Sequence, residues 1–298
     1  MHQPQSTLQR WLRLLRRHRD DMEETANISM PELAFVLLLA AVVVGTAFMI
    51  AYRFVRPAPP DHFVISTGNE AGAYHLFAQR YRDLLAHEKI RVELRPSSGS
   101  VENLQRLTTP DTDVDVALIQ GGIAAPEREY PVRSLGAVYY EPLWVFYRDT
   151  AELTRLTQLA GKRIAAGPEG SGTRALALSM LQASGIATTG APLSPLGGMA
   201  AADALIAGQV DAVLFVAGAD APVIQRLLQS PGVRLMSLTH AEALARRFNY
   251  LSAITLPRGM IDLAADIPAT NISMVAVTAH LVAREDFHPA LISVLLQA

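Results

Sequence analysis

Three glycine-rich segments carry most of the residues in this chain that could bind a ligand. They read TGNEAGAY (67–74), SSGSVEN (97–103) and GPEGSGTRA (167–175). Each follows a strand-like run and precedes a helical pattern of apolar residues. The first turn of a helix has free N–H groups and a positive partial charge, so it favours anions. We therefore expect these turns to bind a small anion.

The third segment resembles a nucleotide-binding loop only in part. Gly167 and Gly172 have the spacing of the glycines in a phosphate-binding loop, but Thr173 stands where that loop has its lysine. There is also no clear aspartate to hold magnesium. A nucleotide site is therefore not expected here.

In the first two segments each candidate residue has a structural alternative. Gly72 permits close approach of the backbone, and Tyr74 either faces the ligand or joins the apolar helix face of Phe77 and Tyr81. In SSGSVEN the expected hydrogen-bond donors to a carboxylate are Ser98, the Gly99 amide and Ser100. The alternative is that Ser100 caps a helix, with Asn103 at its third position.

The second half of the chain offers comparable residues. Ser171, Gly172 and Thr173 could bind an anion as SSGS does, and Arg174 in the first helical turn opposes the helix dipole. A bound anion would compensate for this cation, and Glu169 is the alternative.

Gln120 ends a buried strand and could donate its amide to a ligand, although a polar loop residue is the alternative. Glu141 and Trp144 lie on a strand expected to cross between two halves of the domain. For Trp144 the core is the favoured place.

Few residues point to catalysis. The histidines have no metal-binding spacing, there is no cysteine, and no G-x-S-x-G motif occurs. His75 and Glu141 are the only candidates for an acid or base, and both are weak. The net charge of −2 gives no general attraction to nucleic acid. We expect no catalytic residue, no metal and no cofactor.

The first sixty residues form a separate module. Residues 33–54 contain an uncharged apolar run long enough to cross a bilayer, so we expect a transmembrane anchor there. Residues 1–32 contain five arginines between positions 10 and 19, which favours a cytoplasmic N-terminus. Residues 55–61 form a proline-rich linker. A buried core helix and a cleaved signal peptide are the alternatives to the anchor.

From residue 62 onwards, strands and helices alternate, which predicts an α/β fold with parallel strands. The expected order is strand 63–66, helix 74–86, strand 91–96, a helix from 101 and strand 115–120. A long strand at 139–148 follows, and the pattern then restarts around GPEGSGT. A strand at 272–279 and a helix from about 288 end the chain.

Five segments in serial order resemble the TAXI family, the solute-binding subunits of TRAP-type secondary transporters. They are TGNEAGAYHLFA, SSGSVENLQRL, DVALIQ, LAGKRIAAGPEGSGTRALALSMLQASG and AADALIAGQVDAVLFVAG. The resemblance covers about residues 62–298. It implies a two-lobed fold of the type II periplasmic-binding-protein kind, with lobe 1 at 62–145 plus 241–298 and lobe 2 at 146–240.

The resemblance also implies a function. The ligand would be a small organic acid or amino acid, glutamate- or dicarboxylate-like, which is passed to a TRAP-type permease rather than converted. The cleft residues would be Gly72, Tyr74, Ser98, Gly99, Ser100, Asn103, Gln120, Ser171, Gly172, Thr173 and Arg174. Together with the anchor, it implies a single-pass protein of a bacterial inner membrane whose main domain is periplasmic.

Three features depart from the family pattern. The domain is tethered, His75 replaces a second tyrosine, and the chain ends at LISVLLQA, earlier than expected. A tethered sensory or regulatory domain of the same fold is therefore a second hypothesis. An enzyme on this fold is the third.

Overall fold

The computed structural model describes residues 29–54, 59–70, 72–125, 127–186 and 193–298. The chain divides into two compact units, Met1–Ala58 and Pro59–Ala298. The arginines expected to mark a cytoplasmic N-terminus, and most of the linker, lie outside the described residues.

The first unit contains one helix, α2, among its described residues. It spans Met30–Phe54, and its start is fixed by the Ser29 amide, which donates to Glu32 Oε2 at 2.9 Å. By length and composition the run Met30–Arg53 could cross a membrane, although a signal sequence passes the same test. The helix begins three residues before the expected anchor.

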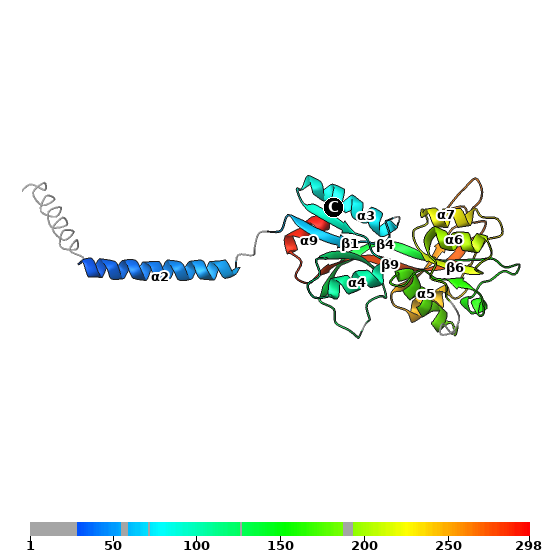
Figure 1. Cartoon of the computed structure of the whole chain (residues 1–298), viewed down its shortest axis with the longest axis horizontal. Coiled ribbons are helices and arrows are strands. Elements are labelled where there is room, and N and C mark those ends of the chain that lie inside the picture. Colours follow the sequence, from blue (N-terminus) through cyan, green and yellow to red (C-terminus); the bar gives the residue numbers. More distant parts are fainter. Residues whose placement is uncertain (1–28, 55–58, 71, 126, 187–192) are drawn as a thin grey trace, which may run out of the picture. The chain divides into compact units, whose positions relative to one another are not determined.

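The second unit is a mixed sheet with helices on both faces (Figure 1). The sheet order is β2-β1-β3-β9-β4-β6-β5, with β7 beside β4 and β8 beside β9. The strands are β1 His62–Ser66, β2 Arg91–Arg95, β3 Val116–Gln120, β4 Val132–Tyr147, β5 Ile164–Ala165, β6 Ala212–Val216, β7 Arg234–Leu235, β8 Leu251–Leu256 and β9 Ile272–Arg284.

The helices of this unit lie between the strands in the chain. They are α3 Ala73–His87, α4 Ser100–Thr108, a 3-10 turn at Leu156–Leu159, α5 Gly172–Ala183, α6 Gly198–Ile206, α7 Pro222–Leu228, α8 Ala241–Arg247 and α9 Pro289–Leu295. In Figure 1, α3, α6 and α7 lie above the strands, and α4 and α5 lie below them.

Alternating side chains of each central strand explain these two layers. In β1, Phe63 and Ile65 pack in the core beneath α3 and α9, whereas Val64 packs against α4. In β4, Val145 faces the α5 side and Trp144 faces the α6 and α7 side. Trp144 is fully buried, as the core interpretation predicted.

Long strands join the two halves of the unit. Strand β4 pairs with β9 from Val132 to Pro142, and then with β6 from Leu143 onwards. Strands β1, β2 and β3 pair in parallel, and β5 pairs in parallel with β6, as the sequence predicts. Two α/β lobes are thus joined at the middle of β4.

Some expected elements differ from the structure. Strand β8 was not expected, and β4 begins at Val132 rather than at residue 139. Strands β5 and β7 have only two residues each. Strand β8 is specified by its pairing with β9, a contact between distant segments that local patterns do not reveal.

The expected lobe boundaries also differ from the core packing. Residues 241–298 were assigned to lobe 1, but Ala241, Leu244, Leu251 and Val275 belong to the core that α5 covers. Helix α8 and strand β8 therefore pack with the second lobe. We propose that lobe 1 is 62–142 plus 278–298 and that lobe 2 is 143–277.

Candidate functional site

The three glycine-rich turns lie at the carboxyl ends of β1, β2 and β5, and each leads into a helix. Gly72 is the N-cap of α3, Gly99 that of α4, and Ser171 that of α5. The expectation that Ser100 caps α4 is wrong, because Ser100 is already the first helical residue. Gly99 takes the cap position with φ +130°, a conformation that glycine adopts readily.

Because Gly99 has no side chain to cap the helix, the first amides of α4 find another partner. The carbonyl oxygen of Gly170, from lobe 2, accepts hydrogen bonds from Val101 N at 3.2 Å and Glu102 N at 3.4 Å. The turn of lobe 2 that contains Gly170 thus occupies the N-terminus of α4 in lobe 1, where an anion would be favoured. The two turns were expected to face each other, and here they are in direct contact.

Glycines make this contact possible. A Cβ added to Gly99 would lie 3.3 Å from Ser171 Cα, and one added to Gly172 would overlap the Gln120 side chain. The Gln120 amide donates to the Gly172 carbonyl at 3.4 Å, so it bridges the lobes. Gly99, Gln120, Ser171 and Gly172 are therefore brought together, and their role in ligand binding stays a prediction.

A buried polar cluster lies beside this contact. Tyr74 OH donates to Glu141 Oε2 at 2.8 Å and lies 3.3 Å from Ser100 Oγ. Tyr139 OH donates to Glu141 Oε1 at 3.4 Å, and Ser100 Oγ accepts from Gln120 N at 3.0 Å. Glu141 sits where β4 passes from one lobe to the other, so the cluster lies at the junction of the lobes.

Tyr74 takes the core position that its spacing allowed, and its role in facing a ligand stays a prediction. It is buried in the core that Phe77 and Tyr81 also line, and its hydroxyl reaches Glu141. Tyr139 is a member of the cluster that the sequence did not single out. A glutamate within an otherwise apolar strand was the available signal for this cluster.

The environment of Glu141 shifts its protonation. Burial raises the pKa of its carboxyl to about 7, although hydrogen bonds from Tyr74 and Tyr139 act in the opposite direction. Burial, together with the nearby Glu141 charge, also raises the pKa of Tyr74 and Tyr139. Within the described residues, no basic side chain forms an ion pair with Glu141. The side chains that stabilise its negative charge are therefore the hydroxyl groups of Tyr74 and Tyr139.

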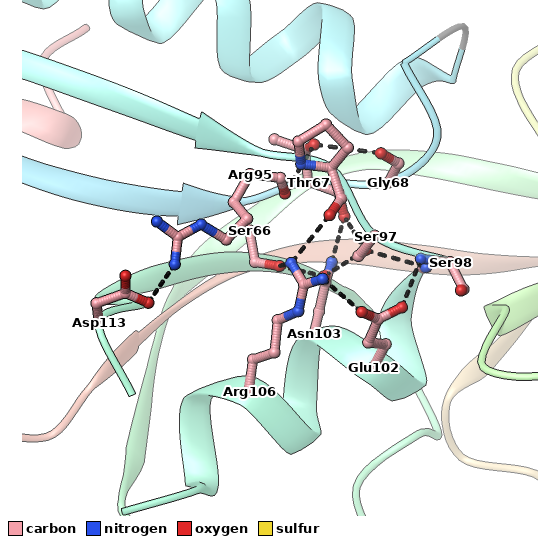
Figure 2. Close-up of polar contacts among 12 residues, drawn as sticks. Ser66, Thr67, Gly68, Arg95, Ser97, Ser98, Glu102, Asn103, Arg106 and Asp113 are labelled. Carbon is pink, nitrogen blue, oxygen red and sulfur yellow. Dashed lines mark hydrogen bonds and ion pairs between the residues drawn. The ribbon is translucent and has the colours of Figure 1, made fainter. Parts of the chain in front are cut away.

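Asn103 has a different place from the one expected. Its Oδ1 accepts from Ser66 Oγ and Ser97 Oγ, both at 2.7 Å, and its Nδ2 donates to the carbonyls of Leu118 and Thr67 (Figure 2). It is completely buried. Asn103 therefore ties the ends of β1, β2 and β3 together and has no free group for a ligand.

Figure 2 also shows how the start of α4 is held. Glu102, at the third helical position, accepts from the Ser98 amide at 2.7 Å and pairs with Arg106 at 2.5 Å. Arg106 in turn donates to Ser66 Oγ and to the Pro96 carbonyl. The Ser98 side chain is exposed, so it remains accessible at the rim of the turn.

The start of α5 is organised by its own side chains. Ser171 Oγ accepts from Arg174 N at 3.2 Å, and Thr173 Oγ1 accepts from Val216 N at 3.2 Å. The Arg174 guanidinium donates to the Gly167 carbonyl at 3.2 Å, and no ion pair with Glu169 forms in the described part of the chain. Arg174 thus has donors left for an anion, whereas Thr173 is used in joining α5 to β6.

No group of three or more histidines, aspartates or glutamates in the described residues could hold a metal ion. Thr67 Oγ1 lies 3.2 Å from His75 Nδ1, but Thr67 is completely buried, so a substrate could not reach this hydroxyl. What the arrangement offers is a set of hydrogen-bond donors that meet at a junction between two lobes. Such an arrangement is suited to binding.

Solved structures confirm the type of fold. The alkanesulfonate-binding protein SsuA of Xanthomonas axonopodis, bound to MOPS, matches with TM-score 0.51 and 18% identity over 81% of this chain and 71% of that one. PhnD1 of Prochlorococcus marinus, in complex with methylphosphonate, matches with TM-score 0.52 and 15% identity over 80% and 83%. The chain therefore has the two-lobed periplasmic-binding-protein fold.

A regulatory domain shares the same architecture. The CcmR regulatory domain of Synechocystis, in complex with 2-PG, matches with TM-score 0.51 and 13% identity over 79% of this chain and 94% of that one. At the level of sequence, the model of the NMT1-like family matches residues 65–296. The chain belongs to the NMT1-like family.

Proposed function

We propose that this chain is a membrane-anchored solute-binding protein that captures a small carboxylate between its two lobes. The observation that carries the proposal is the contact between the glycine turns of the two lobes. Two amides of α4 converge there on one oxygen atom, and the oxygen belongs to Gly170. A ligand carboxylate would present the same kind of acceptor with a full negative charge.

The closed arrangement fits the binding cycle of a two-lobed protein. We propose that the lobes open by hinge motion and that a ligand oxygen replaces the Gly170 carbonyl at Val101 N and Glu102 N. Hydrogen bonds to an ionised acceptor are roughly twice as strong as those to a neutral one. The exchange therefore favours the ligand, and the Arg174 donors add to this preference.

The solved neighbours support an anionic ligand. They are an alkanesulfonate-binding protein, a methylphosphonate complex and a 2-PG complex. The resemblance to the TAXI family favours a glutamate- or dicarboxylate-like ligand for this chain. It also favours a TRAP-type permease as partner, the inner membrane as location and a periplasmic main domain.

Thermal unfolding with added ligands tests this proposal. The unit Pro59–Ala298 holds all four hydrophobic cores of the described chain, so it is suited to separate expression. A panel of glutamate, 2-oxoglutarate, succinate, methanesulfonate and methylphosphonate would be used. A ligand at a hundred times its Kd adds about 2.7 kcal/mol of stability. The shift should largely disappear in Arg174→Ala, and a flat panel contradicts the proposal.

A tethered ligand-sensing domain is the second candidate, and the likeness to the CcmR regulatory domain favours it. Both functions require ligand binding, so they differ in the partner. Co-purification with TRAP permease subunits in a ligand-dependent manner supports transport. Retention of a different cytoplasmic partner through residues 1–32 supports sensing. If the protein converts a metabolite and His75→Ala abolishes this conversion, the chain is instead an enzyme.

A further inference from the structure

A cavity lies between α4 and α5, apart from the cluster around Glu141. Its volume is about 430 Å³, within the range of small-molecule sites. Of the residues expected to bind the ligand, only Gln120 lines it. Because α4 belongs to lobe 1 and α5 to lobe 2, the cavity spans both lobes.

Two helix faces form its long walls. From α4 the wall contains Val101, Leu104 and Thr108, which recur at helical spacing. From α5 it contains Leu176 and Ser179. These walls combine apolar side chains with polar groups in comparable measure.

The end of the cavity is formed by the loop after β3 and by Tyr250. Gly122 has φ +82°, and a Cβ there would overlap the Tyr250 ring, so the backbone lies directly against the ring. Tyr250 is half-buried, and its hydroxyl interacts with Ser179 of the α5 wall. The Gly122 backbone and the Tyr250 ring thus close this end of the cavity.

Arg128 is the one charged residue among those that line the cavity. Its guanidinium carbon lies 5.0 Å from the centre of the Tyr130 ring. No ion pair involves Arg128 within the described residues. A cation held over an aromatic ring and lacking an acidic partner is suited to an anionic group.

We propose that this cavity is a second binding site, for a compact monoanion with an apolar or aromatic body. The anionic group binds Arg128 at the loop, and the body lies between the walls formed by α4 and α5. The hydroxyls of Thr108 and Ser179 donate to backbone carbonyls of their own helices, so they offer only their oxygen atoms, as acceptors, to polar substituents. A ligand here contacts both lobes and so stabilises their closed arrangement.

Binding of 4-fluorophenylacetate to the full chain in lipid nanodiscs tests this site, with ¹⁹F NMR as the readout and empty nanodiscs as the blank. Saturable binding to the wild-type chain is expected. Arg128→Gln should weaken it at least tenfold, because a charged hydrogen bond is lost. Ala175→Phe should abolish it by filling the cavity, and the neutral analogue 4-fluorophenylacetamide should bind far more weakly.

Matched controls separate this site from other causes. Arg234→Gln and Ala243→Phe make the same changes at exposed positions, on β7 and α8, and should bind like the wild type. Arg174→Ala, in the candidate carboxylate site, should also leave probe binding unchanged. The proposal is overturned if the wild-type chain does not bind the probe. It is also overturned if either Arg128→Gln or Ala175→Phe binds the probe as tightly as the wild type. If no ligand of the thermal-unfolding panel stabilises the protein, that result contradicts the carboxylate site and leaves the proposal for this cavity unaffected.

Discussion

At the scale of single residues, Glu141 sets the electrostatics of the lobe junction. Its carboxyl is almost fully buried and has two phenol donors but no cationic partner among the described residues. A charge in this position is stabilised less than in water, which explains the raised pKa. Ionisation of Glu141, at the junction of the lobes, therefore lowers the stability of the folded protein.

The pH dependence of stability should report this ionisation. The pKa of Glu141 is about 7 in the folded protein and 4.5 in its ordinary state, so between these values the folded state binds more protons. Stability should therefore fall as pH rises from about 4.5 to 7. The effect is at most roughly 3 kcal/mol, since each unit of pKa corresponds to about 1.4 kcal/mol.

Glu141→Gln removes this titration and should flatten the profile, with a gain over the wild type at pH 8. Urea unfolding of Pro59–Ala298 at pH 5 and pH 8 measures it. Glu242→Gln, at an exposed position on α8, serves as the control. An unchanged slope in Glu141→Gln would show that another group causes the pH dependence.

Asn103 should behave as a structural residue rather than a ligand contact. Asn103→Ala removes four hydrogen bonds that join the buried ends of β1, β2 and β3. The expected loss is about 3 kcal/mol in urea unfolding. Ser98→Ala, on the exposed rim of the same turn, should change stability by less than about 0.5 kcal/mol. A stable Asn103→Ala protein that has lost ligand binding would reverse this assignment.

At the scale of elements, the sequence predicts what is local. Each glycine turn was recognised because strand, turn and helix follow one another within a few residues, and the parallel pairing of β1, β2 and β3 followed from that order. Strand β8 was missed because it depends on β9. The contact of Gly170 with α4, and the bond from Tyr74 to Glu141, join residues almost seventy positions apart, so no local pattern reveals them.

The contact between α4 and the turn before α5 should be sensitive to any added side chain. Gly172→Ala places a Cβ against the Gln120 side chain and 3.1 Å from Ser100 Oγ. The lobes should then be held further apart, with a larger radius of gyration in small-angle X-ray scattering and weaker ligand binding. Gly121→Ala, whose Cβ would meet nothing nearer than 3.5 Å, is the control. Equal radii for both variants would mean that the contact does not hold the lobes together.

At the scale of the whole molecule, the proposed anchor gives the chain a fixed orientation. The chain contains no cysteine, so a single introduced cysteine reports its own side of the membrane. Ser6→Cys should be protected from an impermeant maleimide in intact spheroplasts, and Ala243→Cys should react. A reactive Ser6→Cys would contradict a cytoplasmic N-terminus, and release of the Ala243→Cys domain into the medium would indicate a cleaved signal peptide.

The same absence of cysteine allows a lock across the two lobes. A Cβ on Gly170 would lie 3.2 Å from Ser98 Cβ, only slightly closer than in ordinary disulfides. Ser98→Cys combined with Gly170→Cys should therefore form a disulfide that holds the turns in contact. If ligands bind by replacing the Gly170 carbonyl, the oxidised variant cannot bind them.

The most direct measurement is calorimetric titration of this double variant, oxidised and then reduced, with the ligand that most stabilises the wild-type domain. We expect no binding in the oxidised form and recovery on reduction, whereas the affinity of each single variant should be the same under oxidising and reducing conditions. Undiminished binding to the oxidised form, verified to contain the disulfide, would contradict a ligand site between the glycine turns of the two lobes.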